Sequence, residues 1–343
     1  MEKRKRLIYL LSLLFFTSHS AFSQSNTDFN PSGKIIARGF FDFSTGIGNE
    51  TKESGYDITR ALLGYNYKFT KNLQGQIVLD AASGKNDKGN LQPHLRNAFV
   101  TWKDEKLCVS AGLVGLLQFK IQEEYWAHRY VFKSLQDENK MGSSVDAGIT
   151  AQYTFSPAIA ADISIINGEG YKKIEKNNST LYGLGVSASP TKGLLLRAYG
   201  DIYTESEECR DALPSEISDT KYKNQYILSL FAGYKNDKIS AGIEYSHQMN
   251  KGFIEDKNSN GYSAYTTVNI SDKWNVYGRY DLLDSSSPDT FISSWNKLDG
   301  QLMILGTEFT VSKQLKISPN LRNINPRIGK SEQYLFVNVE LNL

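Results

Sequence analysis

The chain has 343 residues, 12% of them aromatic, with 27 Gly and only 8 Pro. Its formal net charge of +2, from 39 basic and 37 acidic side chains, is not that of a basic nucleic-acid-binding protein. A mean hydropathy of −0.41 argues against a bundle of membrane-spanning helices. It does not argue against a β-barrel, because barrel strands alternate lipid-facing with water-facing residues.

The N-terminus has the pattern of a secretory leader. Basic residues at 3–6 precede an apolar run at 7–16, and Ala21-Phe-Ser23 follows, with small residues where a signal peptidase reads. The apolar run has about half of the roughly 20 residues that a membrane-spanning helix needs. We therefore expect residues 1–23 to be a cleaved signal peptide and residues 24–343 to be the exported domain. Without the leader, 35 basic and 36 acidic side chains remain, so the net charge is near zero.

Most of the exported chain alternates apolar and polar residues with a period of two, which is typical of strands with one apolar face. The segment 145–155, VDAGITAQYTF, shows this alternation most clearly. We predict sixteen strands, at residues 34–43, 56–69, 73–82, 94–103, 107–115, 145–155, 158–167, 180–189, 193–203, 224–235, 238–249, 261–270, 274–284, 299–310, 315–323 and 333–343. An even number of such strands is typical of a single-chain bacterial membrane barrel.

The connections between these segments alternate in length along the chain. The short ones are 70–72, 104–106, 156–157, 190–192, 235–237, 271–273 and 311–314. The long ones are 44–55, 83–93, 116–144, 168–179, 204–223, 250–260, 285–298 and 324–332. Outer-membrane barrels have short periplasmic turns and long outer loops, whereas a regular alternation of short and long connections is not expected of a soluble β-sandwich. The sequence therefore predicts a transmembrane antiparallel β-barrel.

Residues 116–144 form the one long segment that reads neither as strand nor as turn. Apolar residues and one histidine recur there at spacings of four, three, four and three: Ile121, Tyr125, His128, Phe132 and Leu135. This spacing predicts a helix with one packable stripe, on which His128 is a packed side chain. We call residues 116–144 the plug, and we expect it to fold into the lumen as a constriction loop that leaves Glu123, Arg129 and Lys133 near the narrowest passage.

The inward faces of the predicted strands carry charges of both signs. Those that we assign to the pore lumen are Arg38, Arg60, Asp162, Arg197, Glu244, Arg279 and Arg322. The basic ones near mid-height outnumber the acids there, and acids near strand ends are screened by water. Because rings of Arg or Lys favour anions, we expect a weak anion preference.

Several segments resemble the phosphate-selective porins O and P. They are Ala111-Gly-Leu followed by the plug with residues 124–130 (EYWAHRY), the strand entry at 146–149 (DAGI) and the segment 167–171 (NGEGY). The plug begins with Leu-Leu-Gln-Phe at 116–119, where many family members have a Pro-Phe pair. The resemblance covers nearly all of the exported chain. It implies a sixteen-stranded porin in the outer membrane of a Gram-negative bacterium, in contact with outer-membrane lipid. It further implies a homotrimer that passes small hydrophilic or anionic solutes such as phosphate, without a cofactor.

Two other classes of function stay open at this stage. An adhesin or receptor barrel would act through its outer loops, although these loops are shorter than such a role needs. An outer-membrane hydrolase would need a Ser, a His and an acid together, but His94, His128 and His247 lie in unrelated segments without a nucleophile motif, so we do not expect an enzyme. No Cys or His spacing predicts a metal site, and Cys108 and Cys209 are expected to be free thiols at opposite ends of the barrel.

Overall fold

The computed structural model describes residues 29–47, 54–81, 91–172, 178–208, 222–287 and 299–343. The predicted signal peptide, residues 1–23, lies outside the described residues, and so does Cys209. The barrel is one compact unit that begins at Ser32.

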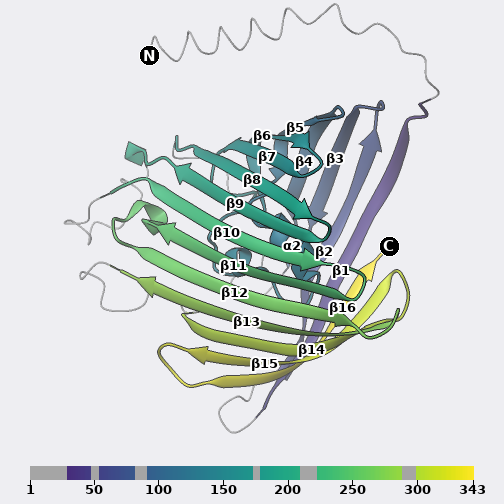
Figure 1. Ribbon diagram of the computed structural model, residues 1–343, viewed down its shortest axis with the longest axis vertical. Coiled ribbons are helices and arrows are strands. Elements are labelled where there is room, and N and C mark those ends of the chain that lie inside the picture. The colour runs from purple at the N-terminus through teal and green to yellow at the C-terminus, as the bar shows by residue number, and fades with distance from the viewer. Residues whose placement is uncertain (1–28, 48–53, 82–90, 173–177, 209–221, 288–298) are drawn as a thin grey trace, which may run out of the picture. The chain divides into compact units, whose positions relative to one another are not determined.

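The described residues form sixteen antiparallel strands that close into a barrel (Figure 1). Each strand pairs with its neighbours in the sequence, and the last pairs with the first. The first eight strands are β1 (Ser32–Gly46), β2 (Ser54–Lys68), β3 (Leu73–Asp80), β4 (His94–Lys103), β5 (Leu107–Gly115), β6 (Val145–Ser156), β7 (Ile159–Ile166) and β8 (Leu181–Thr191). The others are β9 (Leu194–Tyr203), β10 (Gln225–Lys235), β11 (Ile239–Met249), β12 (Asn258–Asn269), β13 (Trp274–Ser286), β14 (Gly300–Thr310), β15 (Leu315–Pro326) and β16 (Glu332–Asn342). All sixteen predicted strands are present, with ends within three residues of the predicted ones.

The outer face of the barrel is a band of large apolar side chains. Leu63, Ile77, Ile243 and Leu305 are each about 60% exposed. Val78, Glu244 and Ile304, each next to one of them in its strand, are 2–5% exposed and point to the inner side. A band of exposed Leu and Ile at alternate positions is the surface that lipid covers in a membrane barrel. The predicted register, with apolar residues outward, is therefore the observed one.

Four of the described strand pairs contain a register shift, and two of these pairs, β1–β2 and β3–β4, carry residues that line the cavities beside the plug. Phe40 and Phe41 of β1 face Arg60 and Ile58 of β2, which leaves one residue of β2 unpaired. In the second bulge, Val78 and Leu79 of β3 face Asn97 and Leu95 of β4, so Arg96 has no partner. A bulge bends its strand and re-aims the side chains beside it.

The plug contains two short helices, α2 (Lys120–Trp126) and α3 (Leu135–Glu138). The single continuous helix that the spacing predicted is wrong: Ala127 takes a left-handed conformation with φ of 60°, and its N–H bonds to the carbonyl of Glu123. Ser134 then caps α3 by accepting from the backbone N–H of Asp137. None of the helices in the described ranges is long and apolar enough to cross a membrane. A further 3-10 turn, η1 (Lys251–Phe253), lies between β11 and β12.

Candidate functional site

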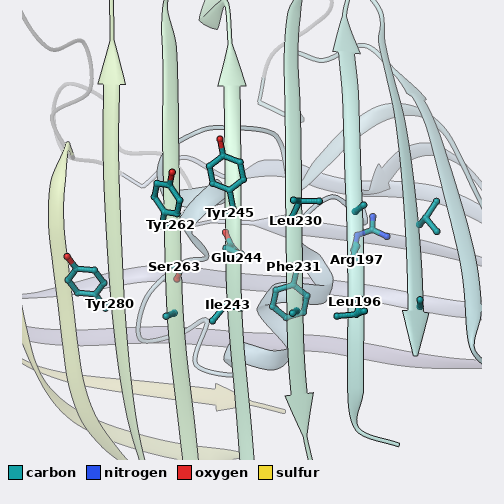
Figure 2. Close-up of a pocket in the computed structure, with 15 residues that line it drawn as sticks. Leu196, Arg197, Leu230, Phe231, Ile243, Glu244, Tyr245, Tyr262, Ser263 and Tyr280 are labelled. Atoms are coloured by element: carbon teal, nitrogen blue, oxygen red, sulfur yellow. The ribbon is translucent and has the colours of Figure 1, made fainter. Parts of the chain in front are cut away.

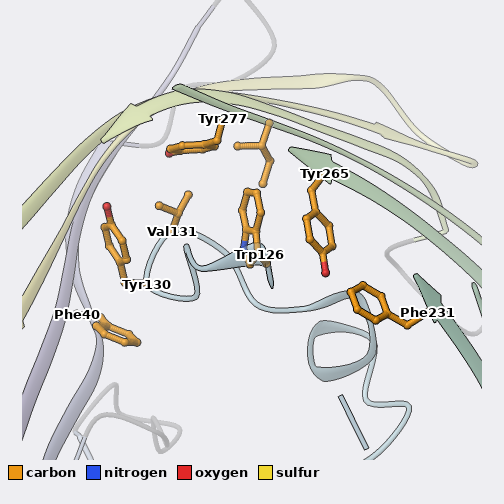
Figure 3. Packing of buried hydrophobic residues seen from close by; sticks show 8 residues of the cluster. Phe40, Trp126, Tyr130, Val131, Phe231, Tyr265 and Tyr277 are labelled. Atoms are coloured by element: carbon orange, nitrogen blue, oxygen red, sulfur yellow. The ribbon is translucent and has the colours of Figure 1, made fainter. Parts of the chain in front are cut away.

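The plug packs onto the inner wall of the barrel through an aromatic cluster (Figure 3). Its buried members are Phe40, Trp126, Tyr130, Val131, Phe231, Tyr265, Tyr277 and Ile304. The Trp126 ring lies 5.6 Å from that of Tyr277 at an interplanar angle of 89° and 5.5 Å from that of Tyr265. Such ring pairs contribute about 0.5–1.5 kcal/mol beyond the area that they bury. The plug is therefore held against one side of the barrel.

The predicted stripe faces this wall although the helix is broken. Ile121, Tyr125 and Phe132 are half-buried against the aromatic cluster, and Leu135 is 1% exposed. His128 is also 1% exposed, and its ring stacks on Tyr277 with 4.2 Å between centroids. The histidine is thus a packed side chain, as expected.

Glu308 of β14 binds the middle of the plug to the barrel wall. His128 Nδ1 lies 3.1 Å from Glu308 Oε2, and the Tyr130 hydroxyl donates to the same oxygen at 2.7 Å. His128 Nε2 lies 2.9 Å from the Thr267 hydroxyl. Burial and the neighbouring Glu308 carboxylate raise the pKa of Tyr130, so this hydroxyl stays a donor. The wall itself contributes Lys316 Nζ, 3.3 Å from Glu308 Oε1.

Three wall arginines bind backbone carbonyls of the plug. Arg197 donates to Leu117 at 3.2 Å. Arg279 donates to Lys133 at 2.7 Å, and Arg322 donates to Val131 at 2.8 Å. These bonds connect β9 to the beginning of the plug and β13 and β15 to its middle. Hydrogen bonds from a guanidinium are among the stronger ones in proteins.

The buried arginines are matched by carboxylates on the wall. Arg197 makes two bonds to Asp162, at 2.6 and 3.0 Å, and Arg279 binds Asp281, with the shortest N–O distance 2.6 Å. Both arginines are 3–4% exposed, and Glu244 is 5% exposed. Asp162, Arg197, Glu244 and Arg279, which the sequence analysis assigned to the pore lumen, are buried beneath the plug and do not face open space.

Two cavities lie between the plug and the opposite wall, which β1–β6 form. The inner cavity, on the side of the short turns, has a volume of about 580 Å³ and is lined by residues such as Gln74, Ser110 and Gln152. The outer cavity, on the side of the long connections, has a volume of about 540 Å³. Both cavities are lined by Arg60, Arg129 and Ser144, so these residues mark their junction.

The charges at the junction are largely paired. Arg60 Nε lies 3.5 Å from Asp80 Oδ2. Arg129 Nε lies 2.9 Å from Glu123 Oε1, and its Nη2 lies 2.6 Å from Asp137 Oδ2. Burial raises the pKa of Glu123, while Arg129 opposes this shift. Asp80 is the last residue of β3, at the end of the strand next to a long connection, and it lies within ion-pair distance of Arg60.

Arg96 is a candidate functional residue that sequence reasoning missed. Strict alternation backward from the buried Thr101 would point Arg96 to lipid, whereas the bulge in β4 brings it to the inner cavity beside Asn97. Arg96 Nη1 donates to Asn97 Oδ1 at 2.7 Å, and it forms no ion pair within the described part of the chain. Arg60 interacts electrostatically with both Arg96 and Arg129. Three guanidinium groups therefore lie at or beside the junction, and Arg96, on the inner side, has no carboxylate within ion-pair distance among the described residues.

The inner cavity has an excess of positive side chains. Its cationic residues are Arg38, Arg60, Arg96, Lys120 and Arg129, and its anionic ones are Glu123 and Glu124. The outer cavity is nearly balanced. Arg60, Arg129, Lys133, Lys140, Lys172 and Arg322 line it with Asp42, Asp57, Asp80, Asp137 and Glu138. Lys133 is exposed there, 3.4 Å from Glu138. In the described ranges no group of His, Cys, Asp and Glu is arranged to hold a metal ion.

The segment 167–171 shapes the outer cavity. Asp146 Oδ2 accepts from the backbone N–H groups of Gly168 at 2.9 Å and Gly170 at 3.0 Å. Both glycines have positive φ, 96° and 78°, which lets the chain fold over this carboxylate. Tyr171 and Lys172 then reach the outer cavity. The two motifs that contain Asp146 and residues 167–171 are thus one structural unit.

Another hollow, of about 710 Å³, lies on the outer face of β8–β13 (Figure 2). Leu230 and Ile243, which border it, are 48% and 62% exposed, while their neighbours Phe231 and Glu244 are 4% and 5% exposed. Its floor consists of small side chains such as Ala232. Because the bordering side chains point away from the lumen, this hollow is separate from the two cavities beside the plug.

The model of the beta-barrel porin-2, OmpL-like family matches residues 140–337, more than half of the chain. The chain belongs to this family. It is thus an outer-membrane β-barrel porin, and the resemblance seen in the sequence is confirmed at this level. No curated protein matches the chain.

Solved porin structures share the fold of this porin. Salmonella typhi OmpF, in a complex with daunomycin, superposes with a TM-score of 0.69 and 11% identity over 91% of this chain and 97% of that chain. An anion-selective porin from Comamonas acidovorans superposes with a TM-score of 0.65 and 11% identity over 92% of this chain and 100% of that chain. The trimer form of in-vitro folded Vibrio cholerae OmpT superposes with a TM-score of 0.60 and 13% identity over 92% of this chain and 100% of that chain. At these identities the likeness establishes the fold alone.

Proposed function

We propose that the porin passes small hydrophilic solutes between the plug and the wall of β1–β6, with a weak preference for anions, phosphate among them. The passage consists of the inner and outer cavities, which adjoin at Arg60, Arg129 and Ser144. Its constriction is formed by Glu123 and Arg129 of the plug, with Lys133 on the outer side. The observation that carries the proposal is Arg96, a guanidinium on the inner side of this junction without an ion-pair partner in the described residues.

The lining of the inner cavity, with five cationic and two anionic side chains, supports anions over cations. Arg60 pairs with Asp80, and Arg129 pairs with Glu123 and Asp137, whereas Arg96 is hydrogen-bonded only to a neutral amide and interacts with Asp80 and Glu123 through longer-range electrostatics. In a narrow passage with a low-dielectric wall, an unpaired charge acts on a passing ion more strongly than it would in bulk water. Arginines around a constriction favour anions for this reason. The preference is weak because the other charges are nearly balanced.

Reversal potentials in a KCl gradient across a planar bilayer test this proposal. We expect the wild-type channel to be anion-selective and Arg96→Gln to lose most of that preference. Arg327→Gln is the matched control, because Arg327 is exposed, pairs with Asp284 and lines neither cavity. A cation-selective wild type, or an Arg96→Gln channel with an unchanged reversal potential, would overturn the proposal.

The proposal extends to export and assembly. We propose that residues 1–23 are removed on export to the outer membrane and that the mature barrels associate as a homotrimer. The trimer form of OmpT, which has the same fold, supports this assembly. Mass spectrometry of the protein from outer membranes should give an N-terminus at Gln24, and chemical cross-linking in mild detergent should stop at three chains. A different N-terminus would contradict cleavage after Ser23, and products of one or two chains only would contradict the trimer.

A further inference from the structure

We propose that the inner cavity binds a small hydroxylated carboxylate, such as a sugar acid, during its passage. The carboxylate would bind Arg96, and the hydroxyl groups would bond to neutral amides nearer the short turns. This inference rests on the proposed channel and specifies its solute class. Both parts of the site belong to one cavity, lined by β1–β6 and the plug.

Below the arginines the wall of the inner cavity carries neutral polar side chains. Gln74 of β3, Thr101 of β4, Ser110 of β5 and Thr150 of β6 occupy directly opposed positions on four consecutive strands. Gln76 and Gln152 line the same cavity. We call Gln74, Gln76 and Gln152 the amide belt.

The amide belt has hydrogen-bonding capacity that the protein does not use. All three glutamines are half-buried, and within the described ranges none of their amide groups forms a side-chain hydrogen bond. Each amide offers two donors and one acceptor. By contrast, the hydroxyls of Thr101 and Ser110 bond to each other at 2.7 Å. The free groups are therefore both donors and acceptors, which suits hydroxyl groups of a solute better than a bare ion.

The inner cavity also has apolar lining residues. Leu116, Leu117 and Phe119 lie on the plug side, beside the charged side chains named above, and Phe99 of β4 lies opposite Gln76 on the wall. A solute that meets both kinds of lining residue needs C–H surface as well as hydroxyl groups, and a sugar acid has both. A volume of about 580 Å³ lies within the usual range of about 300–1,000 Å³ for small-molecule sites. Inorganic phosphate would use the arginines and leave the amide belt and the apolar residues without a ligand.

The carboxylate end of such a solute fits Arg96. Its Nη1 is bonded to Asn97, and no ion pair within the described residues competes for the guanidinium. A guanidinium binds a carboxylate with two parallel hydrogen bonds, and this geometry fixes the orientation of the solute. The hydroxyl groups would then extend from Arg96 toward the amide belt.

Block of the chloride current by added solutes tests the inference on the full mature protein in bilayers. The probes are glucuronate, hexanoate, glucose and phosphate. We expect glucuronate to block at a concentration about tenfold lower than hexanoate or glucose, because it alone uses both the arginine and the amides. The Gln76→Leu/Gln152→Leu double variant should remove the advantage of glucuronate over hexanoate and keep the anion preference. Arg96→Gln should weaken block by both carboxylates alike.

The control is Gln333→Leu, the same change at an exposed position on β16 that lines neither cavity. It should leave every block unchanged. Equal block by glucuronate and hexanoate in an anion-selective wild type would overturn the inference while the proposed function stands. Stronger block by phosphate than by glucuronate would also overturn it. A channel without anion preference would instead contradict the proposed function.

Discussion

Arg96 reaches the cavity because one residue of β4 has no partner in the β3–β4 ladder. The bulge puts Leu95, 45% exposed, on the lipid side and both Arg96 and Asn97 on the inner cavity. A regular ladder would have placed a guanidinium in the membrane at a cost of about 2–4 kcal/mol. The charge at the junction therefore depends on backbone geometry as much as on residue type.

The register of β6 can be tested with two adjacent positions. Ile149 is 53% exposed on the outer face, and its neighbour Thr150 lines the inner cavity. Ile149→Arg should lower the free energy of unfolding by about 2–4 kcal/mol and reduce assembly, as measured by urea unfolding in lipid. Thr150→Arg should assemble normally and increase the anion preference. Equal loss of stability in both variants would show that the assigned faces are wrong.

Glu308 offers a test of how the plug is held. Glu308→Gln replaces the carboxylate with a neutral amide, so the contacts to His128 and Tyr130 lose their charge-assisted strength and plug docking should weaken by about 1–3 kcal/mol. We expect noisier single-channel currents and faster proteolysis between α2 and α3, with the barrel still folded. The matched change Glu332→Gln, at an exposed position on β16, should have no effect. A quiet, protease-resistant Glu308→Gln channel would rule out this docking role.

The plug is the element that the sequence predicted least completely. Its position, its inward fold and its buried stripe were predicted, since apolar spacing indicates which side chains pack. The break at Ala127 was not, because neither Gly nor Pro marks it and the packing of its neighbours Trp126 and His128 on the wall cannot be read from local sequence. For the same reason the bonds from Arg197 and Arg279 to plug carbonyls were not predicted: the path of the plug backbone cannot be read from alternation.

Replacing residues 120–140 with a short Gly-Ser linker tests the position of the plug. The variant should keep a folded barrel, because the sixteen strand pairings do not involve these residues. Its single-channel conductance should increase, since the aromatic cluster that fills part of the lumen loses its plug members. Bilayer recordings give the conductance, and circular dichroism checks the β content. An unchanged conductance in a folded variant would place the plug outside the conducting path.

At the scale of the whole molecule, closure is the feature that the sequence predicted best. The alternation of apolar and polar residues and the alternation of short and long connections recur along all sixteen strands. An error at one strand end therefore does not change the number of strands predicted. β16 pairs with β1 from Arg38↔Asn342 to Gly46↔Tyr334, and the Leu343 N–H bonds to the Ala37 carbonyl at 2.9 Å. Closure leaves no unpaired strand edge in the membrane.

Closure makes the last strand indispensable. A chain that ends at Ser331 lacks β16, so β1 and β15 would each become an open edge in lipid. We expect this variant not to form the barrel, and the shift in gel mobility on heating that folded barrels show should be lost. Leu343→Phe, which keeps the strand and its apolar end, should retain the shift. A normal shift in the truncated chain would mean that β16 is dispensable.

The plug is bound mainly to the wall formed by β9–β15. The two sides of the lumen therefore differ in which substitutions they tolerate. Hydrogen bonds and aromatic contacts that hold the plug constrain that wall, so substitutions there alter folding. On the facing strands β2–β6, several cavity-lining side chains, such as Gln76 and Gln152, form no side-chain hydrogen bond within the described residues. Substitutions in β2–β6 alone can therefore change which solutes the channel prefers, while the barrel fold and the position of the plug stay the same.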